Sequence, residues 1–474
     1  MAGYSNRGGA QAAPILVTNP SDEQVEYPAG TPPAIEEPRS YNVIGNGINA
    51  TIIAGKPRNI YELYRESHAG FLWFPDIHSF VHSGKLMAFA SLNNDDLENA
   101  IDAHVSLRSN DFGQTWSRSD TCDVAGFSNG PCRLRHFDSA TGRLYEWGAF
   151  KMQPYPNDGT NRQTFRCERS YYANAGAKCV REANGSLWTG LPVPATADPF
   201  HITYPEPAAA RPRHTWAALF GEGEIAVMAD GGWGTVLDCE LENPANENGQ
   251  DAYFTGAFYK SYDKGVTWSF VNFVDKRESG VTENTFFRGP NNDKLVCIFR
   301  NFGADNSTPN KATISTDPTG SAWTPSFFPD PGNHGVARIG NSAPTSCALT
   351  GGGRILCAGR TGNDALNVSV NLDGGDSPDS VWGWWSLTEH HDFWANDGGT
   401  DLATASGAPG LIHKFWPNPS KSEVSTCYAG VTEIAPDEFM IIYDYTPSYR
   451  APIGYTYQHL PNCIYVVHCK LVRG

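Results

Sequence analysis

The stretch SNDFGQTW, residues 109–116, decides the fold of this chain, because its fixed residues suit a tight turn between two strands. The carboxylate of Asp111 can accept hydrogen bonds from the turn amides, and Gly113 supplies the positive φ that other residues resist. Trp116 places a large apolar side chain beneath the loop. A second copy, SYDKGVTW at 261–268, argues against chance. The two copies predict a structural unit that recurs along the chain.

Two weaker copies of this pattern follow toward the C-terminus. STDPTGSAW at 315–323 carries one extra residue before its Trp, and NLDGG at 371–375 precedes Trp382. The last three copies are spaced at roughly 50 to 60 residues, a period that predicts the blades of a β-propeller when the repeat consists of strands and turns. The loops resemble the Asp-boxes of the sialidase superfamily. That resemblance implies that their aspartates are scaffold, on the side away from the active site.

Six segments each show β-favouring apolar residues around a Gly, Asn or Asp turn. They are 74–91, 133–150, 213–231, 282–301, 345–362 and 427–445. Six such hairpins predict six blades, and the apolar strand at 463–472 is expected to close the ring by pairing with an N-terminal strand. We therefore predict an all-β fold, a six-bladed sialidase-like β-propeller over residues 41–474 that follows an extended N-terminal arm, residues 1–40.

The N-terminal arm is rich in Pro, Gly, Ala and acidic residues, which favours an extended segment over a packed element. Such an arm wraps its own propeller or docks on a neighbouring subunit of an assembly. Its start lacks the basic stretch followed by an apolar core that marks a signal peptide. We expect an extracellular or virion-associated protein, which reaches that location after processing or by release on lysis.

The composition argues against several classes of function. The 474 residues carry a formal net charge of −16, which argues against nucleic acid and anionic membrane as partners. No apolar run approaches the length of a membrane span. The 11 cysteines show no paired spacing of the kind that binds a metal, so we expect neither a metal nor another cofactor.

The C-terminal hairpin carries the clearest likeness to a sialidase active site. The segment YAGVTEIAPDEFMIIYD, 428–444, resembles the sialidase segment that opens with the nucleophilic tyrosine and closes with Tyr-Glu. The resemblance implies that Tyr428 is the nucleophile and that Tyr443 and Asp444 contact substrate in place of the closing pair. A phenol is a poor nucleophile unless a base accepts its proton.

The fourth hairpin, TENTFFRGPNNDKLVCIFR at 282–300, supplies that base by the same resemblance. Glu283 corresponds to the glutamate that activates the tyrosine, and Arg300 to one arginine of a clamp for the substrate carboxylate. The general acid and base is expected on a loop after the first hairpin, where Asp102 fits best by position and the acidic pair at 95–96 is a rival. A carboxyl group in the wall of a propeller funnel suits this role when its pKa is raised.

The other two clamp arginines depart from the sialidase pattern. Trp73-Phe74-Pro75 stands where the family begins its first hairpin with Arg-Ile-Pro. The third arginine should fall near residue 363, and the nearest is Arg360, which is out of register and remains a substrate-binding candidate. A Trp cannot replace a guanidinium in two-pronged carboxylate recognition. The sequence therefore argues against sialic acid itself.

Three histidines occupy related places in the first three hairpins, namely His78, His136 and His214. If they face one funnel, they could contact substrate or bind a metal, and one could act as the base in β-elimination from a uronic acid. Each histidine taken alone fits an ordinary hydrogen-bonded strand residue. As a set with Tyr428 and Arg300, they keep a polysaccharide lyase as a rival to a hydrolase.

Two classes of function remain open at this point. The first is a propeller that binds a glycan and cleaves a terminal sugar, with acidic sugars among the candidates, as an exo-acting glycoside hydrolase or a related lyase. The second is a non-catalytic carbohydrate-binding or receptor-binding protein, such as a virion tail or surface component, which the arm and the two missing arginines favour. Fold alone does not decide between them, because propellers also serve as scaffolds.

Overall fold

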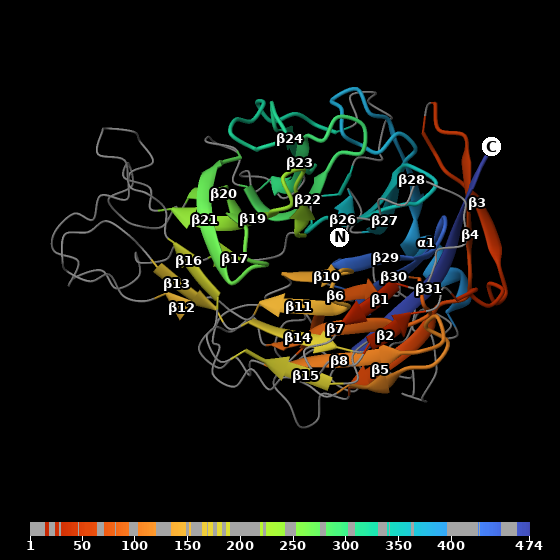
Figure 1. Ribbon diagram of the computed structural model, residues 1–474. Helices are drawn as coiled ribbons and strands as arrows, with labels where there is room; N and C mark the ends of the chain where they lie inside the picture. Colours follow the sequence, from red (N-terminus) through yellow and green to blue (C-terminus); the bar gives the residue numbers. More distant parts are fainter. Residues whose placement is uncertain are drawn as a thin grey trace, which may run out of the picture.

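The described residues form seven β-sheets, and six of these sheets are the blades of a propeller (Figure 1). In the computed structural model the described residues are 15–18, 24–27, 30–45, 47–63, 71–80, 82–93, 103–119, 134–147, 151–152, 164–167, 169–173, 178–182, 186–189, 219–220, 224–241, 253–274, 281–301, 309–329, 339–340, 342–361, 365–395, 425, 427–446 and 462–474. The predicted all-β, six-bladed fold is confirmed.

The first three blades lie in chain order around the ring. Blade 1 contains β6 (Phe71–Ser79), β7 (Leu86–Asn93), β8 (Ala103–Ser109) and β9 (Ser117–Arg118). Blade 2 contains β10 (Arg135–Asp138), β11 (Arg143–Trp147), β14 (Arg169–Ala173) and β15 (Lys178–Arg181). Blade 3 contains β17 (Leu219–Phe220), β18 (Ala226–Val227), β19 (Trp233–Leu241), β20 (Tyr253–Ser261) and β21 (Thr267–Phe273), and its outer edge is extended by β16 (Ser186–Thr189), β13 (Thr164–Cys167) and β12 (Lys151–Met152).

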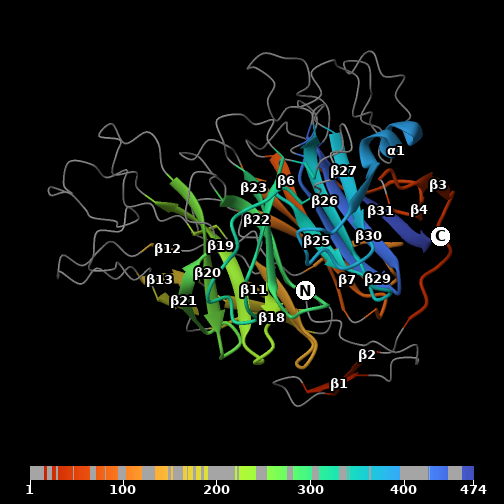
Figure 2. The same cartoon turned by 90° about the horizontal axis from the view of Figure 1, so that it is seen from above.

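The remaining blades complete the circle. Blade 4 contains β22 (Val281–Arg288), β23 (Leu295–Asn301) and β24 (Lys311–Ile314). Blade 5 contains β25 (Thr345–Ala348), β26 (Arg354–Thr361), β27 (Ala365–Asn371) and β28 (Trp382–Ser386). Blade 6 contains β29 (Ala429–Ala435), β30 (Glu438–Tyr445), β31 (Asn462–Arg473), β4 (Ala50–Ala54), β3 (Arg39–Asn42) and β5 (Arg58–Leu63). The helix α1 (Leu387–Trp394) packs beside β27, as Figure 2 shows.

Five of the predicted hairpins form as expected, but the one predicted at 213–231 does not. In that segment β17 and β18 both pair with β19, so they are two parts of one interrupted inner strand. The turn lies one step later, where the Gly231 amide donates to the Met228 carbonyl at 3.0 Å. Gly231 has a φ of +83°, which glycine adopts without the clash that a Cβ would cause.

Strands from both ends of the chain close the ring in blade 6. β31 pairs on one side with β30 and on the other with β4 and β5, with Cys469 opposite Ala54 and Ile464 opposite Tyr61. The expected pairing of the C-terminal strand with an N-terminal strand is therefore confirmed. It removes the open sheet edge that an unclosed ring would expose.

The two octapeptide turns, 109–116 and 261–268, fold identically in their hydrogen bonds. In the first, the Asp111 carboxylate accepts from the Thr115 amide at 2.9 Å and from the Ser109 hydroxyl at 2.7 Å. In the second, Asp263 accepts from the Thr267 amide at 2.8 Å and from the Ser261 hydroxyl at 2.8 Å. In both, the Trp indole donates to the carbonyl of the turn glycine, which has positive φ. The roles predicted for these residues are confirmed.

Each of these turns packs against the blade that precedes its own in the ring. A Cβ on Gly113 of blade 1 would meet Met440 of blade 6, and one on Gly265 of blade 3 would meet Trp147 of blade 2. The Trp147 indole also donates to the Gly265 carbonyl at 3.0 Å. The turns therefore join neighbouring blades at the periphery.

The described part of the N-terminal arm contacts the chain's own propeller. Residues 15–18 and 24–27 form the separate two-stranded sheet of β1 (Ile15–Thr18) and β2 (Gln24–Tyr27). The Gly30 amide then donates to the His82 carbonyl at 3.0 Å, and the Lys56 amide to the Glu36 carbonyl at 3.2 Å. Among the described residues no helix is long and apolar enough to cross a membrane.

Candidate active site

Tyr428, Glu283 and Arg300 meet at the centre of the ring, although they come from blades 6 and 4. The Tyr428 hydroxyl donates a hydrogen bond to Glu283 Oε1. Arg300 Nη1 donates to Glu283 Oε2 at 3.0 Å and lies 3.5 Å from the Tyr428 hydroxyl oxygen. The side chains of Arg300 and Glu283 are 11% and 15% exposed, and Tyr428 is buried. The structure thus brings together three of the residues singled out from the sequence.

The backbone around Tyr428 is strained at three residues. Phe74, Glu283 and Cys427 have φ values of +50°, +30° and +62°. The other described non-glycine residues with positive φ lie in turns and connections between strands. A left-handed conformation costs a bulky residue roughly 1–3 kcal/mol and persists only where the surrounding structure imposes it, which is common at active sites.

Two of these residues lie where an inner strand loses its regular register. The pairing of β22 with β23 shifts between Thr282 and Asn284, and Glu283 lies at that irregularity. The pairing of β6 with β7 shifts between Trp73 and Asp76, a stretch that includes Phe74. A bulge re-aims a side chain out of the alternation of a regular strand. It accounts for a Glu283 carboxylate that points at Tyr428 from two blades away.

Phe74 packs directly on the candidate nucleophile. The rings of Phe74 and Tyr428 meet edge to face with centroids 4.1 Å apart, and both are buried with Ala343 in one small apolar cluster. Phe74 therefore lies beside Tyr428 in the hairpin from which the first clamp arginine is missing.

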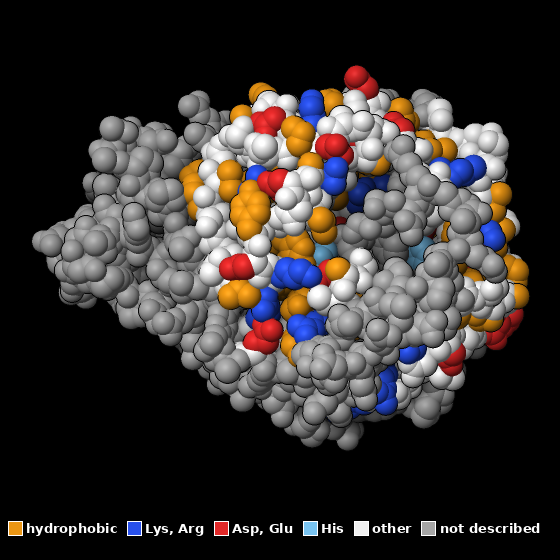
Figure 3. All heavy atoms as spheres, viewed as in Figure 1, with side chains coloured by type: hydrophobic (Ala, Val, Ile, Leu, Met, Phe, Trp, Pro, Cys, Tyr) orange, Lys and Arg blue, Asp and Glu red, His pale blue; other side chains and the backbone are white. Residues whose placement is uncertain are grey.

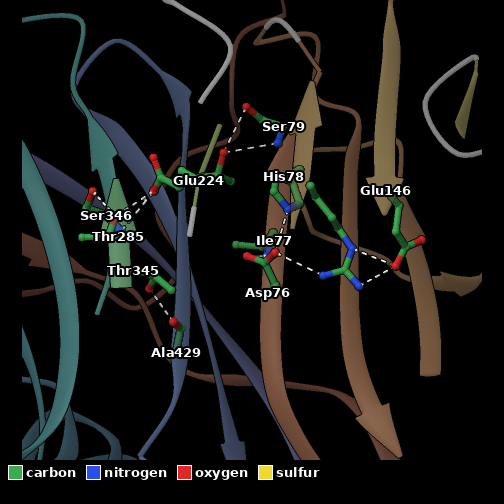
Figure 4. A network of polar contacts seen from close by, with 12 residues as sticks. Asp76, Ile77, His78, Ser79, Glu146, Glu224, Thr285, Thr345, Ser346 and Ala429 are labelled. Atoms are coloured by element: carbon green, nitrogen blue, oxygen red, sulfur yellow. Dashed lines mark hydrogen bonds and ion pairs between the residues drawn. The ribbon is translucent and has the colours of Figure 1, made fainter. Parts of the chain in front are cut away.

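A second group of polar residues links blades 3, 4 and 5 across the ring (Figure 4). Glu224 Oε1 accepts from the Ser346 amide at 3.3 Å and from the Thr285 hydroxyl at 3.4 Å. Arg354 donates to the Ser346 hydroxyl at 2.9 Å and stacks on Phe287, with its guanidinium carbon 3.4 Å from the ring centroid. Burial lowers the pKa of Arg354 to about 10, which still leaves the guanidinium charged at neutral pH.

A third group joins blades 1 and 2 and contains the predicted His78. His78 Nε2 lies 2.8 Å from Asp76 Oδ2, and Arg135 Nη1 reaches the same oxygen at 3.3 Å (Figure 4). Arg135 also donates to Glu146 Oε1 at 2.7 Å. Asp76 and His78 are partly exposed, whereas Arg135 and Glu146 are buried. His78 therefore belongs, through its contact with Asp76, to a network of polar contacts between the two blades.

His136, Tyr443 and Asp444 lie in packed surroundings. The His136 ring is buried against Trp233, with centroids 4.5 Å apart. Burial, together with nearby positive charge, lowers the pKa of His136 well below its ordinary value, so it is neutral. The Tyr443 hydroxyl contacts His391 Nδ1 of α1 at 2.8 Å, and buried Asp444 accepts from the Ser425 hydroxyl at 2.8 Å.

The structure describes the other predicted site residues only in part or not at all. Arg360 lies on β26, but its side chain is outside the described part of the structure. Asp102, His214 and the acidic pair at 95–96 fall outside the described residues. Within the described residues, no group of three or more His, Cys, Asp or Glu side chains is arranged to hold a metal ion.

Sequence reasoning missed Phe74, Asp76, Arg135 and Glu224 as residues of the centre. Asp76 lies in the FPDIHSF stretch of the first hairpin, and a period-2 count from His78 would have placed it on the same strand face. Glu224 lies between β17 and β18, the two parts of the interrupted inner strand of blade 3, and no local pattern marks it. On the face shown in Figure 3, acidic and basic side chains of the described residues are interspersed.

Comparisons with known proteins give structural neighbours only. No protein-family model matches the chain, and no curated protein matches its sequence. A protein of unknown function from Dyadobacter fermentans DSM 18053 superposes with a TM-score of 0.52 at 12% identity, over 88% of this chain and 99% of that one. Similarity at this identity shows a shared fold.

Two further solved structures superpose less closely. The GH93 α-L-arabinofuranosidase of Fusarium graminearum, in complex with arabinobiose, gives a TM-score of 0.48 at 12% identity over 88% of this chain and 97% of that one. Trypanosoma rangeli sialidase, in complex with the inhibitor DANA, gives a TM-score of 0.44 at 12% identity over 84% of this chain and 55% of that one.

Proposed function

We propose that this propeller is a glycoside hydrolase that cleaves a terminal sugar bound at the centre of the ring, with Tyr428 as its nucleophile. The observation that carries the proposal is the hydrogen bond from the Tyr428 hydroxyl to Glu283, held on the other side by Arg300. A nucleophile paired with a base that a third group orients is the general signature of nucleophilic catalysis. The strained backbone at Glu283 and Cys427 supports the same assignment.

The geometry suggests a double displacement. The Tyr428 oxygen bonds to the anomeric carbon while its proton passes to Glu283, the glycosidic C–O bond breaks, and the leaving oxygen takes a proton from a general acid. A water then loses a proton to that same acid/base and attacks the anomeric carbon, and the tyrosine oxygen recovers its proton from Glu283. The sugar is released with net retention of configuration. Asp102 is the proposed general acid, by its position in the sequence.

Arg300 is proposed as a positioning residue in this scheme. Its Nη1 holds Glu283 Oε2 at 3.0 Å, which leaves Oε1 directed at the phenol. The nearby positive charge also favours the developing phenolate, because a cation within about 4–6 Å stabilises the charged form of an acid.

The test is a substrate panel with a matched pair of tyrosine variants. Aryl glycosides and polysaccharides are incubated with the protein, and both reducing sugar and unsaturated-uronate absorbance are measured. Tyr428→Phe is expected to lower kcat at least a hundredfold while leaving glycan affinity nearly unchanged. Tyr259→Phe, which removes the hydroxyl of another buried strand tyrosine, is expected to keep full activity.

Three outcomes would contradict the proposal. Absorbance from unsaturated uronate would favour a lyase, and binding without turnover would favour a carbohydrate-binding or receptor-binding protein. Full turnover by Tyr428→Phe with loss of turnover in Glu283→Gln would move the nucleophile from the phenol to the carboxylate.

A further inference from the structure

We infer that the central site takes an uncharged glycan and rejects anionic sugars, and that Phe74 is the residue that sets this preference. The inference rests on the proposed function, because it takes the Tyr428 site to be the place where the glycan binds. It concerns only which sugars bind at that site. It is argued from three observations on the described residues around Tyr428.

The first observation is the surface that Phe74 presents. Its ring lies edge to face with Tyr428 at 4.1 Å, on a strained φ of +50°. A substrate group bound beside the Tyr428 ring on this side meets an apolar aromatic side chain in place of a cationic one. Burying a carboxylate against such a surface without a hydrogen-bonded partner is strongly unfavourable, whereas the C–H face of a neutral sugar packs well on it.

The second observation is that the guanidinium beside the phenol already has an anionic partner. Arg300 binds Glu283 at 3.0 Å. A substrate carboxylate could recruit Arg300 only by competing with Glu283, which would leave two carboxylates at one cation. Removing the partner of a buried charge is costly, and Glu283 is also the proposed base for Tyr428.

The third observation is the charge of the surrounding groups. Arg135 is bound to Asp76 at 3.3 Å and to Glu146 at 2.7 Å. Arg354 is buried on Phe287 and attracted by Glu224. Among the described residues of the three central groups, the carboxylates outnumber the guanidinium groups. The carboxylates are those of Asp76, Glu146, Glu224 and Glu283, and the guanidinium groups are those of Arg135, Arg300 and Arg354. This balance favours a ligand that brings hydroxyl groups over one that brings another negative charge.

The test begins with the unmodified protein on a glycan array that holds uncharged oligosaccharides, their uronic-acid counterparts of the same linkage, and sialylated and sulfated glycans. We expect the bound glycans to be uncharged, with at least tenfold weaker binding of each anionic counterpart. Binding to no glycan at all, or tighter binding of the anionic member of a pair, overturns the inference.

A pair of variants then tests the role of Phe74. Phe74→Arg places a cation beside Tyr428 and is expected to shift the ratio of anionic to neutral affinity at least tenfold toward the anionic member. Phe74→Leu keeps an apolar group there and is expected to retain the preference for neutral glycans. An unchanged ratio in Phe74→Arg, or a preference for anionic glycans in Phe74→Leu, overturns the assignment. If Phe74→Arg does not fold, the leucine variant and the array with the unmodified protein still decide.

The two proposals fail in different ways. Hydrolysis of a uronoside or sialoside would retain the hydrolase and overturn the preference for uncharged glycans. Selective binding of neutral glycans without any turnover would retain the preference and overturn the hydrolase.

Discussion

The octapeptide turns at the periphery and the Tyr428 site at the centre both contain residues with positive φ. The two regions differ in which residues take the most positive φ values and in where the partners of their side chains lie. The turns place glycine where φ is most positive, Gly113 at +74° and Gly265 at +80°. Their polar side chains satisfy one another within eight residues of sequence. The centre instead holds Phe74, Glu283 and Cys427 in this conformation, with partners in other blades.

The difference separates structural from functional use of the backbone. Glycine at a left-handed position carries little strain, so the turns gain stability and a fixed shape. A non-glycine residue at such a position costs stability that glycine would not. In the turns, Phe112 and Lys264 have positive φ at a chain reversal, whereas at the centre Phe74, Glu283 and Cys427 have it within or beside inner strands, where it directs side chains toward Tyr428. Substitutions in each region test this distinction.

The largest effect is expected at the centre, from Glu283→Gln. The amide keeps the shape of the carboxylate but cannot accept the phenolic proton, so kcat should fall roughly a thousandfold, while the free energy of unfolding changes by only about 1 kcal/mol. Initial rates and urea denaturation measure the two quantities. The comparison breaks if stability falls and the activity per folded molecule is unchanged.

At the periphery, Gly265→Ala should destabilise the fold by about 3 kcal/mol and Gly113→Ala by about 1–2 kcal/mol. Both alanines would be held at positive φ. At Gly265 the new Cβ would lie 2.2 Å from Cζ2 of the buried Trp147 ring, whereas at Gly113 it would lie 2.9 Å from the flexible end of Met440. Urea denaturation measures the pair. Equal losses would contradict the idea that the neighbouring blade decides the cost.

Acidification tests whether the fold loses stability through protonation of buried His390 while Asp111 in the first turn is still charged. Buried His390 has its Nε2 2.8 Å from the Gly55 carbonyl oxygen and its Nδ1 2.8 Å from the Tyr41 hydroxyl. The carbonyl only accepts, so Nε2 carries the proton, Nδ1 accepts from Tyr41, and the ring is neutral. Burial lowers the pKa of His390 to about 4, against 6.5 unfolded.

The sign of the effect follows from this shift. Between pH 6.5 and 4 the unfolded chain binds more protons at His390 than the folded chain, so stability falls as the pH falls, by about 3 kcal/mol in total over this window. His390→Gln can donate to Gly55 and cannot titrate, so its stability should depend less steeply on pH. Urea denaturation at pH 7, 5.5 and 4.5 measures how steeply the stability of the parent and of the variant depends on pH, and equal slopes would refute the assignment.

The first turn is not expected to titrate in the same window. Burial opposes ionisation of Asp111, but hydrogen bonds from Thr115 and Ser109 lower its pKa, so its carboxylate stays charged.

The smallest effect is expected from Asp111→Ala in the first turn. It removes hydrogen bonds that are partly exposed to solvent, so the loss should be about 1–2 kcal/mol in the free energy of unfolding. Activity per folded molecule should be unchanged, because the turn lies at the periphery. A large loss of kcat in this variant would remove the distinction between the two regions.

The turns and most hairpins could be predicted from the sequence because their interactions are local. Ser109, Asp111 and Thr115 bond within a few residues of one another, and the alternation of apolar residues shows which strands are half-buried. The third blade escaped this reasoning because its inner strand is interrupted, and the GEG sequence at 221–223 resembles a turn as much as the DGG at 230–232 does.

The centre could be predicted only in part. Resemblance to a sialidase motif pointed to Tyr428, Glu283 and Arg300, which the structure brings together. Glu224 and Ser346 bond across three blades and 122 residues of sequence, and no local pattern reports such a contact. The bulges that place Phe74 and Glu283 arise from tertiary packing, which local propensity does not encode.

The closure of blade 6 sets an order for the synthesis of this protein. β4 and β5 leave the ribosome before blades 1 to 5 are made, but their sheet partner β31 follows all five of those blades in the sequence. Until β31 is made, the early strands keep an unpaired edge, and the pairing that closes the ring spans the residues of five intervening blades. Such distant pairing is slow and leaves the edge exposed to other nascent chains. The ring can therefore close only after the strands of all six blades have been synthesised, and a chain that lacks β31 cannot close it.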